Sequence, residues 1–126
     1  MAYTIKKALV VDDEEPLREI IGEVLALLNI ETFKAENGNT ALEIAQKHKA
    51  EIDLMLIDFY MPEMSGEEAY AKLKHILPNC PVVFMSGYDY TDQISSTPGD
   101  PPKVFVKKPF TIAQLQTTVK SFIENV

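Results

Sequence analysis

The feature that most constrains the fold is a regular alternation of short apolar runs with longer segments of helical periodicity. The runs "KKALVV", "LMLI", "PVVFM" and "VFV" have the length of strands, and "IETFKA" alternates between apolar and polar residues. Between these runs, apolar residues recur three and four positions apart, as they do along one face of a helix. Strands that alternate with helices predict an α/β fold with a parallel sheet between two layers of helices.

The apolar patterns also predict where individual elements lie. The runs at residues 54–57 and 81–85 are continuously apolar, which is typical of strands buried on both faces, whereas the alternating run from Ile30 belongs near an edge of the sheet. Pro16 lies near the first turn of the first helix, and the second helix follows a turn at Asn37 and Gly38. The apolar stripe of the first helix consists of Leu17, Ile20, Ile21, Val24, Leu25 and Leu28.

Two helices are predicted to begin at capping boxes, in which a serine or threonine is followed three residues later by Glu or Gln. Ser65 and Glu68 open the helix in "SGEEAYAKLKHIL", and Thr111 and Gln114 open the last helix of the chain. The buried face of that last helix is predicted to consist of Ile112, Leu115, Val119 and Phe122.

Residues 89–103 interrupt the alternation. They occupy the place of a fourth helix, but they contain Pro98, Gly99, Pro101 and Pro102. Proline removes a backbone donor and restricts the residue before it, so a regular helix cannot extend beyond about Ser96. The sequence therefore predicts a shortened fourth helix within residues 89–95, followed by a loop.

Composition and charge exclude several classes of protein. A chain of 126 residues fits a single domain, residues 1–126. Its net charge of −7 argues against direct binding to nucleic acid and to an anionic membrane surface. Without an apolar stretch of membrane-spanning length or a signal-peptide core, the expected location is cytoplasmic. The one cysteine, Cys80, is interpreted as a small packed residue and not as a reactive thiol.

Polar side chains follow four of the predicted strands. Asp12 and Asp13 come after the first strand, Asp58 after the third, Ser86 after the fourth and Lys108 after the fifth. In an open parallel sheet, ligands bind in the crevice at the carboxyl ends of the strands. Each residue alone has an ordinary explanation, since Asp13 could cap a helix, the lysine could be solvated and the serine could belong to a turn.

Together, these residues predict a specific chemistry. Three carboxylates at one sheet edge repel one another unless a cation neutralises them, and oxygen ligands with open positions suit Mg²⁺. A carboxylate held beside a metal and a lysine can attack phosphorus and form an aspartyl-phosphate, so Asp58 is the predicted nucleophile. Mg²⁺ and Lys108 would neutralise the charge on the transferring group, and the Ser86 hydroxyl could bind a phosphoryl oxygen.

The motifs "VVDDE", "LIDFYMPEMSG", "VVFMSGY" and "VFVKKPF", in this order and spacing, give the chain a close resemblance to the receiver domain of two-component response regulators. The resemblance extends from about residue 6 to the end of the chain. It implies a flavodoxin-like, doubly wound parallel sheet of five strands in the order 2-1-3-4-5. It also implies that Asp58 accepts a phosphoryl group from a sensor histidine kinase or a histidine phosphotransfer protein, after which the domain switches conformation.

The same resemblance implies roles for individual residues. Asp13 and Asp58 would bind Mg²⁺ directly, with the backbone carbonyl of Tyr60, and Asp12 would act through water. Ser86 and Lys108 take the positions that sense the phosphoryl group. Phe105 falls where the family carries its switch aromatic, with an ordinary core aromatic as the alternative.

The shortened fourth helix is a departure from most receivers and is similar to receivers attached to hybrid sensor kinases. The chain is expected to be either a single-domain regulator or a receiver cut from a longer chain, and Met1, close to the first strand, favours a complete N-terminus. Beyond its own phosphorylation and dephosphorylation it is not expected to be an enzyme.

Three other functions are weighed against this one. Phosphohydrolases of the haloacid dehalogenase type need a second aspartate two residues after the nucleophile, where this chain has Tyr60. A receiver-like module that only binds partners, independently of phosphorylation, would be expected to lack an acid, the acceptor or the lysine. A flavodoxin-like redox protein would need a phosphate-binding loop where this chain has the acidic "DDEEP".

Overall fold

The computed structural model describes residues 3–87 and 101–123. Its sheet contains five parallel strands in the spatial order β2-β1-β3-β4-β5, which confirms the predicted fold and strand order. The strands are β1 (Lys7–Val11), β2 (Glu31–Ala35), β3 (Leu54–Asp58), β4 (Val82–Ser86) and β5 (Lys103–Lys107).

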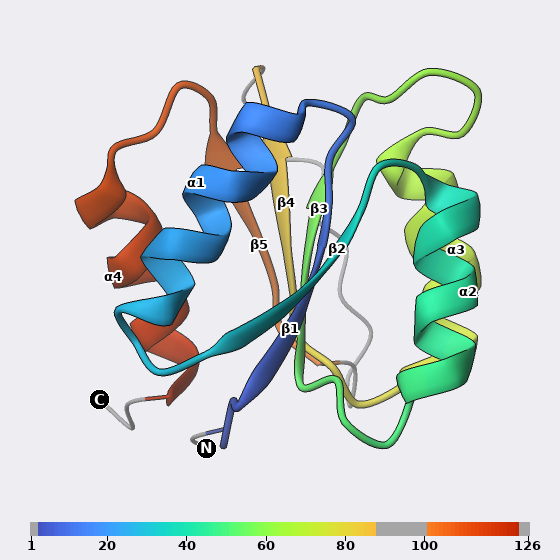
Figure 1. Cartoon of the computed structure of the whole chain (residues 1–126), viewed down its shortest axis with the longest axis horizontal. Helices are drawn as coiled ribbons and strands as arrows, with labels where there is room; N and C mark the ends of the chain where they lie inside the picture. Colours follow the sequence, from blue (N-terminus) through green and yellow to red (C-terminus); the bar gives the residue numbers. More distant parts are fainter. Residues whose placement is uncertain (1–2, 88–100, 124–126) are drawn as a thin grey trace.

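Within the described residues, four helices cover the two faces of this sheet. They are α1 (Glu15–Ala26), α2 (Gly38–His48), α3 (Gly66–Ile76) and α4 (Ile112–Ile123). Figure 1 shows α1 and α4 on one face and α2 and α3 on the other. The shortened fourth helix predicted at residues 89–95 lies outside the described residues. Among the residues described, no helix is long and apolar enough to cross a bilayer.

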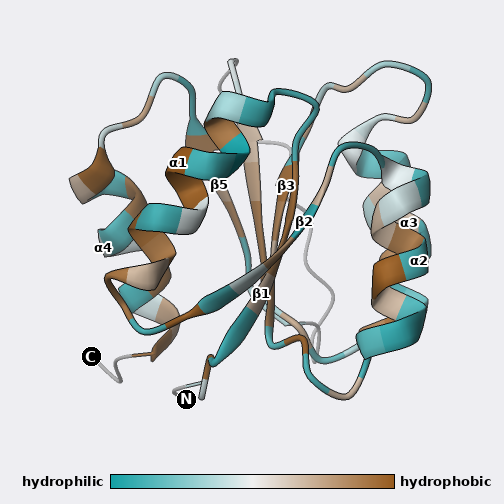
Figure 2. Ribbon diagram, viewed as in Figure 1, coloured by the Kyte–Doolittle hydropathy of each residue, from teal (hydrophilic) through white to brown (hydrophobic). Residues whose placement is uncertain are grey.

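The sheet separates two apolar cores, and Figure 2 shows the apolar residues gathered on the strands and on the inner sides of the helices. Alternate strand residues face opposite sides, so Val10 and Leu56 pack towards α1 and α4, whereas Leu9 and Ile57 pack towards α2 and α3. Strand β3 is buried along its whole length, and β2 forms an edge of the sheet with exposed positions. Both observations confirm the sequence prediction.

The capping box predicted at Thr111 and Gln114 has both of its bonds, whereas at Ser65 and Glu68 the N-cap bond is present and the Glu68 side chain accepts from the Ser65 hydroxyl at 3.3 Å instead of from its amide. The backbone amide of Glu68 donates to Ser65 Oγ at 3.1 Å, and the amide of Gln114 donates to Thr111 Oγ1 at 3.0 Å. The Thr111 amide in turn donates to Gln114 Oε1 at 2.8 Å. These bonds satisfy amides that lack a partner within the helix, so they fix where α3 and α4 begin.

Two residues of the predicted apolar stripes are exposed, and the prediction that Ile112 is buried is wrong. Ile20 on α1 is 48% exposed and Ile112 on α4 is 56% exposed. Ile20 lies at the margin of its apolar stripe, whose centre points into the core. Ile112 is the first residue of α4, and side chains of a helix tilt towards its N-terminus, so this one projects past the end of the helix. The other predicted stripe residues are buried or packed against the core.

The structure confirms that Cys80 is a packed residue. Its side chain is buried, its thiol donates to the carbonyl of Ile52 at 3.0 Å, and burial raises the pKa of the thiol to about 11. Because only the thiolate is nucleophilic, we expect alkylation of the native protein at pH 8 to be slower than that of the unfolded chain by on the order of 100-fold. Intact mass after timed exposure to iodoacetamide, with and without guanidinium, measures the ratio. Equal rates would contradict this prediction.

Candidate functional site

The carboxyl ends of four strands meet at one edge of the sheet and bring together the residues singled out in the sequence. Ile57 of β3 pairs with both Val11 and Phe84, and Phe84 pairs with Phe105, so the four strands end nearly level. The acids that follow β1 and end β3, which are Asp12, Asp13 and Asp58, each offer a carboxylate oxygen within 4.8 Å of the others.

A lysine from the last strand faces two of these acids. Lys108 Nζ lies 3.1 Å from Asp12 Oδ2 and 3.4 Å from Asp58 Oδ2. Burial lowers the pKa of Lys108, but the hydrogen bond to Asp12 and the charges of Asp12 and Asp58 outweigh this effect, and the pKa is raised. The ammonium therefore stays charged and offsets part of the negative charge at this edge.

Asp12 is the most constrained of the three acids. Its side chain has no exposure to solvent. One carboxylate oxygen, Oδ1, accepts from the amide of Glu14 at 2.9 Å, and the other accepts from Lys108. Its amide donates to the carbonyl of Ala35 at 3.1 Å, and its carbonyl accepts from Arg18 Nη1 at 2.7 Å.

Asp13 has a different environment from Asp12, because it is exposed. The sequence left open that Asp13 caps the first helix, and the structure places the N-cap at Glu14, without a capping bond from its side chain. Asp13 is thus available to the acidic cluster and to solvent.

Asp58 is the last residue of β3 and is 5% exposed. Burial raises its pKa to about 6, and the charge of Asp12 adds to the effect, whereas Lys108 and the amide of Tyr60 oppose it. The Tyr60 amide donates to Asp58 Oδ1 at 3.3 Å. Tyr60 itself lies in the loop after β3 and is 52% exposed. The raised pKa means that the charged form of Asp58 is disfavoured here. A cation bound beside it would stabilise that charged form.

Ser86 and Lys108 are tied together through the backbone. Ser86 is the last residue of β4, is 1% exposed, and pairs in register with Lys107. The Lys108 amide donates to the Ser86 carbonyl at 2.6 Å. The backbones that carry the hydroxyl and the ammonium are therefore joined at one corner of the sheet, which we call the lysine corner (Ser86, Lys107 and Lys108).

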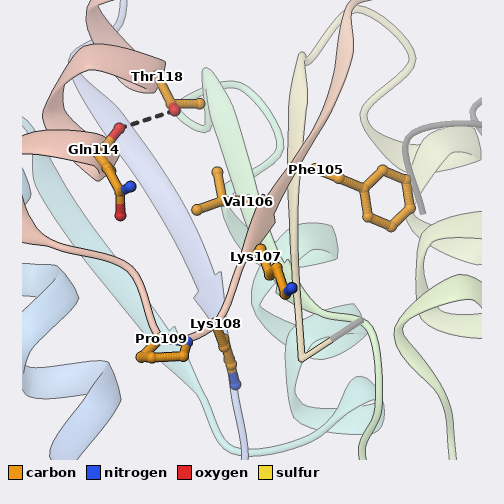
Figure 3. Close-up of a pocket in the computed structure, with 7 residues that line it drawn as sticks. All are labelled: Phe105, Val106, Lys107, Lys108, Pro109, Gln114 and Thr118. Carbon is orange, nitrogen blue, oxygen red and sulfur yellow. Dashed lines mark hydrogen bonds between the residues drawn. The ribbon is translucent and has the colours of Figure 1, made fainter. Parts of the chain in front are cut away.

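The predicted switch aromatic points away from the lysine corner. Figure 3 shows Phe105 on one side of β5 and Val106 on the other, towards α4. The ring of Phe105 lies 5.3 Å from that of Phe59 and 5.2 Å from that of Phe84, measured between centroids. Phe105 thus contacts the residue that follows Asp58, inside a half-buried aromatic cluster.

A pocket of about 340 Å³ lies between β5 and α4, next to the lysine corner. Figure 3 shows its polar side, where Thr118 Oγ1 donates to the Gln114 carbonyl at 2.9 Å. Its lining residues include Lys107, Lys108 and Pro109 but none of the three acids. The pocket therefore borders the acidic cluster through Lys108 alone and is not the candidate site.

Sequence patterns did not single out Gly66, on which the geometry of Asp58 also depends. A Cβ atom built on Gly66 would overlap the Asp58 carbonyl oxygen and lie 2.8 Å from both the Asp58 carbonyl carbon and the Phe59 Cα. The Gly66 amide donates to the Phe59 carbonyl at 2.9 Å. The only sequence signal was a glycine directly after the N-cap serine of α3.

The donor set at this edge fits a hard divalent cation. It consists of carboxylate oxygens within reach of one another, with one exposed acid, Asp13, through which a hydrated ion could enter. Mg²⁺ takes oxygen ligands, often from one or two carboxylates, and retains water molecules. The acid cluster predicted from the sequence is therefore present.

This fold and this edge define a class of signalling domain that exchanges phosphoryl groups. A family model described as the response regulator receiver domain matches residues 8–120, and the chain belongs to this family. Members of the family are the phosphoacceptor signalling domains of two-component systems, so the family, fold and general function predicted from the sequence are confirmed.

Curated relatives include both large and small proteins. The chain is 36% identical over 119 residues to the sensor kinase CckA of Brucella abortus, covering 93% of this chain and 12% of the kinase. It is 33% identical over 118 residues to the sporulation initiation phosphotransferase F of Bacillus subtilis, covering 94% of each. It spans 31% of a cyclic di-GMP phosphodiesterase of Thermotoga maritima, at 31% identity over 117 residues. The chain thus spans small parts of some relatives and nearly all of another.

Solved structures agree with this assignment. The receiver domain of the hybrid histidine kinase CckA matches with a TM-score of 0.79 and 30% identity, covering 94% of this chain and 99% of that one. The response regulator protein TrrA of Thermotoga maritima, in complex with Mg²⁺-BeF, matches with a TM-score of 0.76 and 30% identity, covering 94% of this chain and 100% of that one.

Proposed function

We propose that Asp58 is the phosphoacceptor of this receiver domain and that it reacts in the presence of Mg²⁺. The observation that carries the proposal is the position of its buried carboxylate, at the end of β3, within 3.4 Å of Lys108 Nζ and in reach of two further acids. The phosphodonor would be a phosphohistidine on a sensor histidine kinase or a histidine phosphotransfer protein. Because such kinases use ATP, the proposal implies a cytoplasmic location.

In the proposed reaction, a carboxylate oxygen of Asp58 attacks the phosphorus of the phosphohistidine. The new bond is P–O, the bond that breaks is P–N, and the donor imidazole leaves with the bonding electrons and takes up a proton. Lys108 faces the developing charge on the phosphoryl oxygens, and such fixed charges supply most of the catalysis in phosphoryl transfer. Once bound, Mg²⁺ would neutralise further charge on the same oxygens.

The roles proposed for the acids towards Mg²⁺ are supported by the other bonds that each of them makes. The carboxylate oxygens of Asp12 accept hydrogen bonds from the protein at 2.9 and 3.1 Å. The contacts of the Asp58 oxygens with the Tyr60 amide and with Lys108 are longer, at 3.3 and 3.4 Å, so a role through water is favoured for Asp12. Asp13 and Asp58 are then the direct ligands, joined by the backbone carbonyl of Tyr60. Ser86 would bind a phosphoryl oxygen, and Phe105, in contact with Phe59, would respond as the switch aromatic.

Under this proposal the chain is one receiver domain over residues 1–126, without catalytic turnover of its own and without direct contact to nucleic acid or membrane. The phosphohydrolase alternative lacks support, because the residue two positions after Asp58 is Tyr60 and not an acid. A receiver-like module that works without phosphorylation lacks support as well, since the three acids and Lys108 are present and close together.

Phosphorylation of Asp58 can be tested by intact mass after incubation with acetyl phosphate and Mg²⁺. We expect the wild-type chain to gain one phosphoryl group and Asp58→Asn to gain none, because its amide is not nucleophilic. Asp53→Asn is the matched control: it makes the same change at the residue directly before the same strand, and its side-chain oxygen still accepts from the Lys6 amide. A gain that persists in Asp58→Asn would rule out this acceptor.

Metal binding can be tested through thermal stability. Mg²⁺ that binds the folded chain raises its Tm by mass action. We expect Asp13→Asn to lose most of this rise, because it removes the exposed ligand, whereas Glu15→Gln should keep it, because Glu15 lies in the first turn of α1 outside the cluster. Thermal unfolding with EDTA and with saturating Mg²⁺ measures the shift for each protein. Equal shifts in Asp13→Asn and wild type would exclude Asp13 as a ligand.

A further inference from the structure

Arg18 is the side chain from α1 that reaches back to the acidic edge. It lies at the end of the first turn of α1, and its own amide donates to the Glu14 carbonyl at 3.0 Å. Its guanidinium Nη1 donates to the carbonyl oxygen of Asp12 at 2.7 Å. Neither the motifs nor the proposed phosphoryl transfer assigns a role to this contact.

The contact completes the anchoring of Asp12. The amide of Asp12 donates to Ala35, its two carboxylate oxygens accept from Glu14 and Lys108, and only its carbonyl depends on a side chain of α1. A carbonyl belongs to the peptide plane that leads into the next residue. Arg18 therefore fixes the orientation of the peptide from which the exposed Asp13 departs.

Charge alone does not give this guanidinium a favourable role in binding a cation. A positive side chain beside a cluster of carboxylates repels an incoming cation, so by Coulomb's law it would weaken the binding of Mg²⁺. Its contribution to a cation site must then be geometric. Mg²⁺ requires nearly ideal octahedral geometry with oxygen ligands at about 2.0–2.1 Å, so the backbone that carries a ligand has to be held in place.

We propose that Arg18 is a positioning residue for Mg²⁺: its bond to the Asp12 carbonyl holds the Asp12–Asp13 peptide so that the Asp13 carboxylate meets the cation together with Asp58. The inference rests on the proposed metal site. Outer contacts that orient metal ligands change affinity by about 10- to 100-fold when they are removed, and Arg18 acts through the main chain, which places it at the lower end of that range.

The test is a titration of Arg18→Met with Mg²⁺ at a temperature well below Tm. Chemical shifts of the backbone amides report the fraction of protein that has bound the ion. We expect the affinity to fall about tenfold, although the variant has lost a positive charge. Lys34→Met is the matched control, because it removes a positive charge that pairs with Glu19 on the surface, at 3.2 Å. Loss of charge without loss of geometry should leave its Mg²⁺ affinity unchanged or slightly higher.

Arg18→Lys provides the second variant, since it retains the charge and one donor. We expect its Mg²⁺ affinity to lie between those of wild type and Arg18→Met. An affinity of Arg18→Met equal to or above that of wild type would overturn the inference, as would a loss of the same size in Lys34→Met. If wild type itself does not bind Mg²⁺, the proposed metal site fails instead, so the two failures are distinguishable.

Discussion

Gly66→Ala is expected to destabilise the protein by about 3 kcal/mol, because the added methyl group would overlap main-chain atoms that cannot move independently. The methyl carbon would lie 2.8 Å from the Asp58 carbonyl carbon and from the Phe59 Cα. Helix α3 cannot retreat without losing the bond from the Gly66 amide to the Phe59 carbonyl, now 2.9 Å long. Urea unfolding of both proteins measures the loss.

Gly87→Ala is the control for this substitution. Gly87 also follows a strand at the same edge, but a Cβ atom built there meets nothing within 4 Å. We expect its stability to stay within about 0.5 kcal/mol of wild type, as surface substitutions usually do. Because the overlap in Gly66→Ala involves Asp58, that variant should also accept phosphoryl groups more slowly. A Gly66→Ala protein as stable as Gly87→Ala would show that α3 can shift at little cost.

The second large effect is a gain of stability in Asp58→Asn when no divalent cation is present. Burial and the charge of Asp12 raise the pKa of Asp58 to about 6, so the folded chain holds a proton that the unfolded chain releases at lower pH. The folded state therefore loses stability as pH rises from about 4 to 6, and the loss persists at pH 7. At about 1.4 kcal/mol per pKa unit, this loss of folding stability is about 3 kcal/mol. The uncharged amide of Asp58→Asn avoids the loss.

Unfolding in EDTA at pH 7 and at pH 3.5 checks this prediction. We expect Asp58→Asn to be more stable than wild type at pH 7 and nearly equal to it at pH 3.5, where the carboxyl is mostly protonated in both states. Mg²⁺ at pH 7 should narrow the difference, because it stabilises the wild-type carboxylate. If the stability difference between Asp58→Asn and wild type had the same size at both pH values, its cause would be packing and not charge.

Much of the fold could be predicted because it follows from local patterns. Continuous apolar runs identified β3 and β4, and the capping boxes at Ser65 and Thr111 identified the starts of α3 and α4. The acids and Lys108 could be placed at one edge because parallel strands end on the same side of a sheet. The exposure of Ile20 and Ile112 was not predicted, because helical periodicity gives the direction of a face but not what lies opposite it.

The sequence by itself determined the strand and helix pattern, the edge at which Asp12, Asp13, Asp58 and Lys108 meet, and, through its motifs, the family. Only the tertiary structure decided how these four residues differ. It buried Asp12 and bonded each of its polar atoms, left Asp13 exposed, and placed Gly66 against Asp58 and Arg18 against the Asp12 carbonyl. The contact of Asp12 with Lys108 joins residues 96 positions apart in the chain. The contacts of Arg18 and Gly66 are closer in sequence, but they depend on how the chain folds back between a strand and the next helix, which residue spacing does not specify.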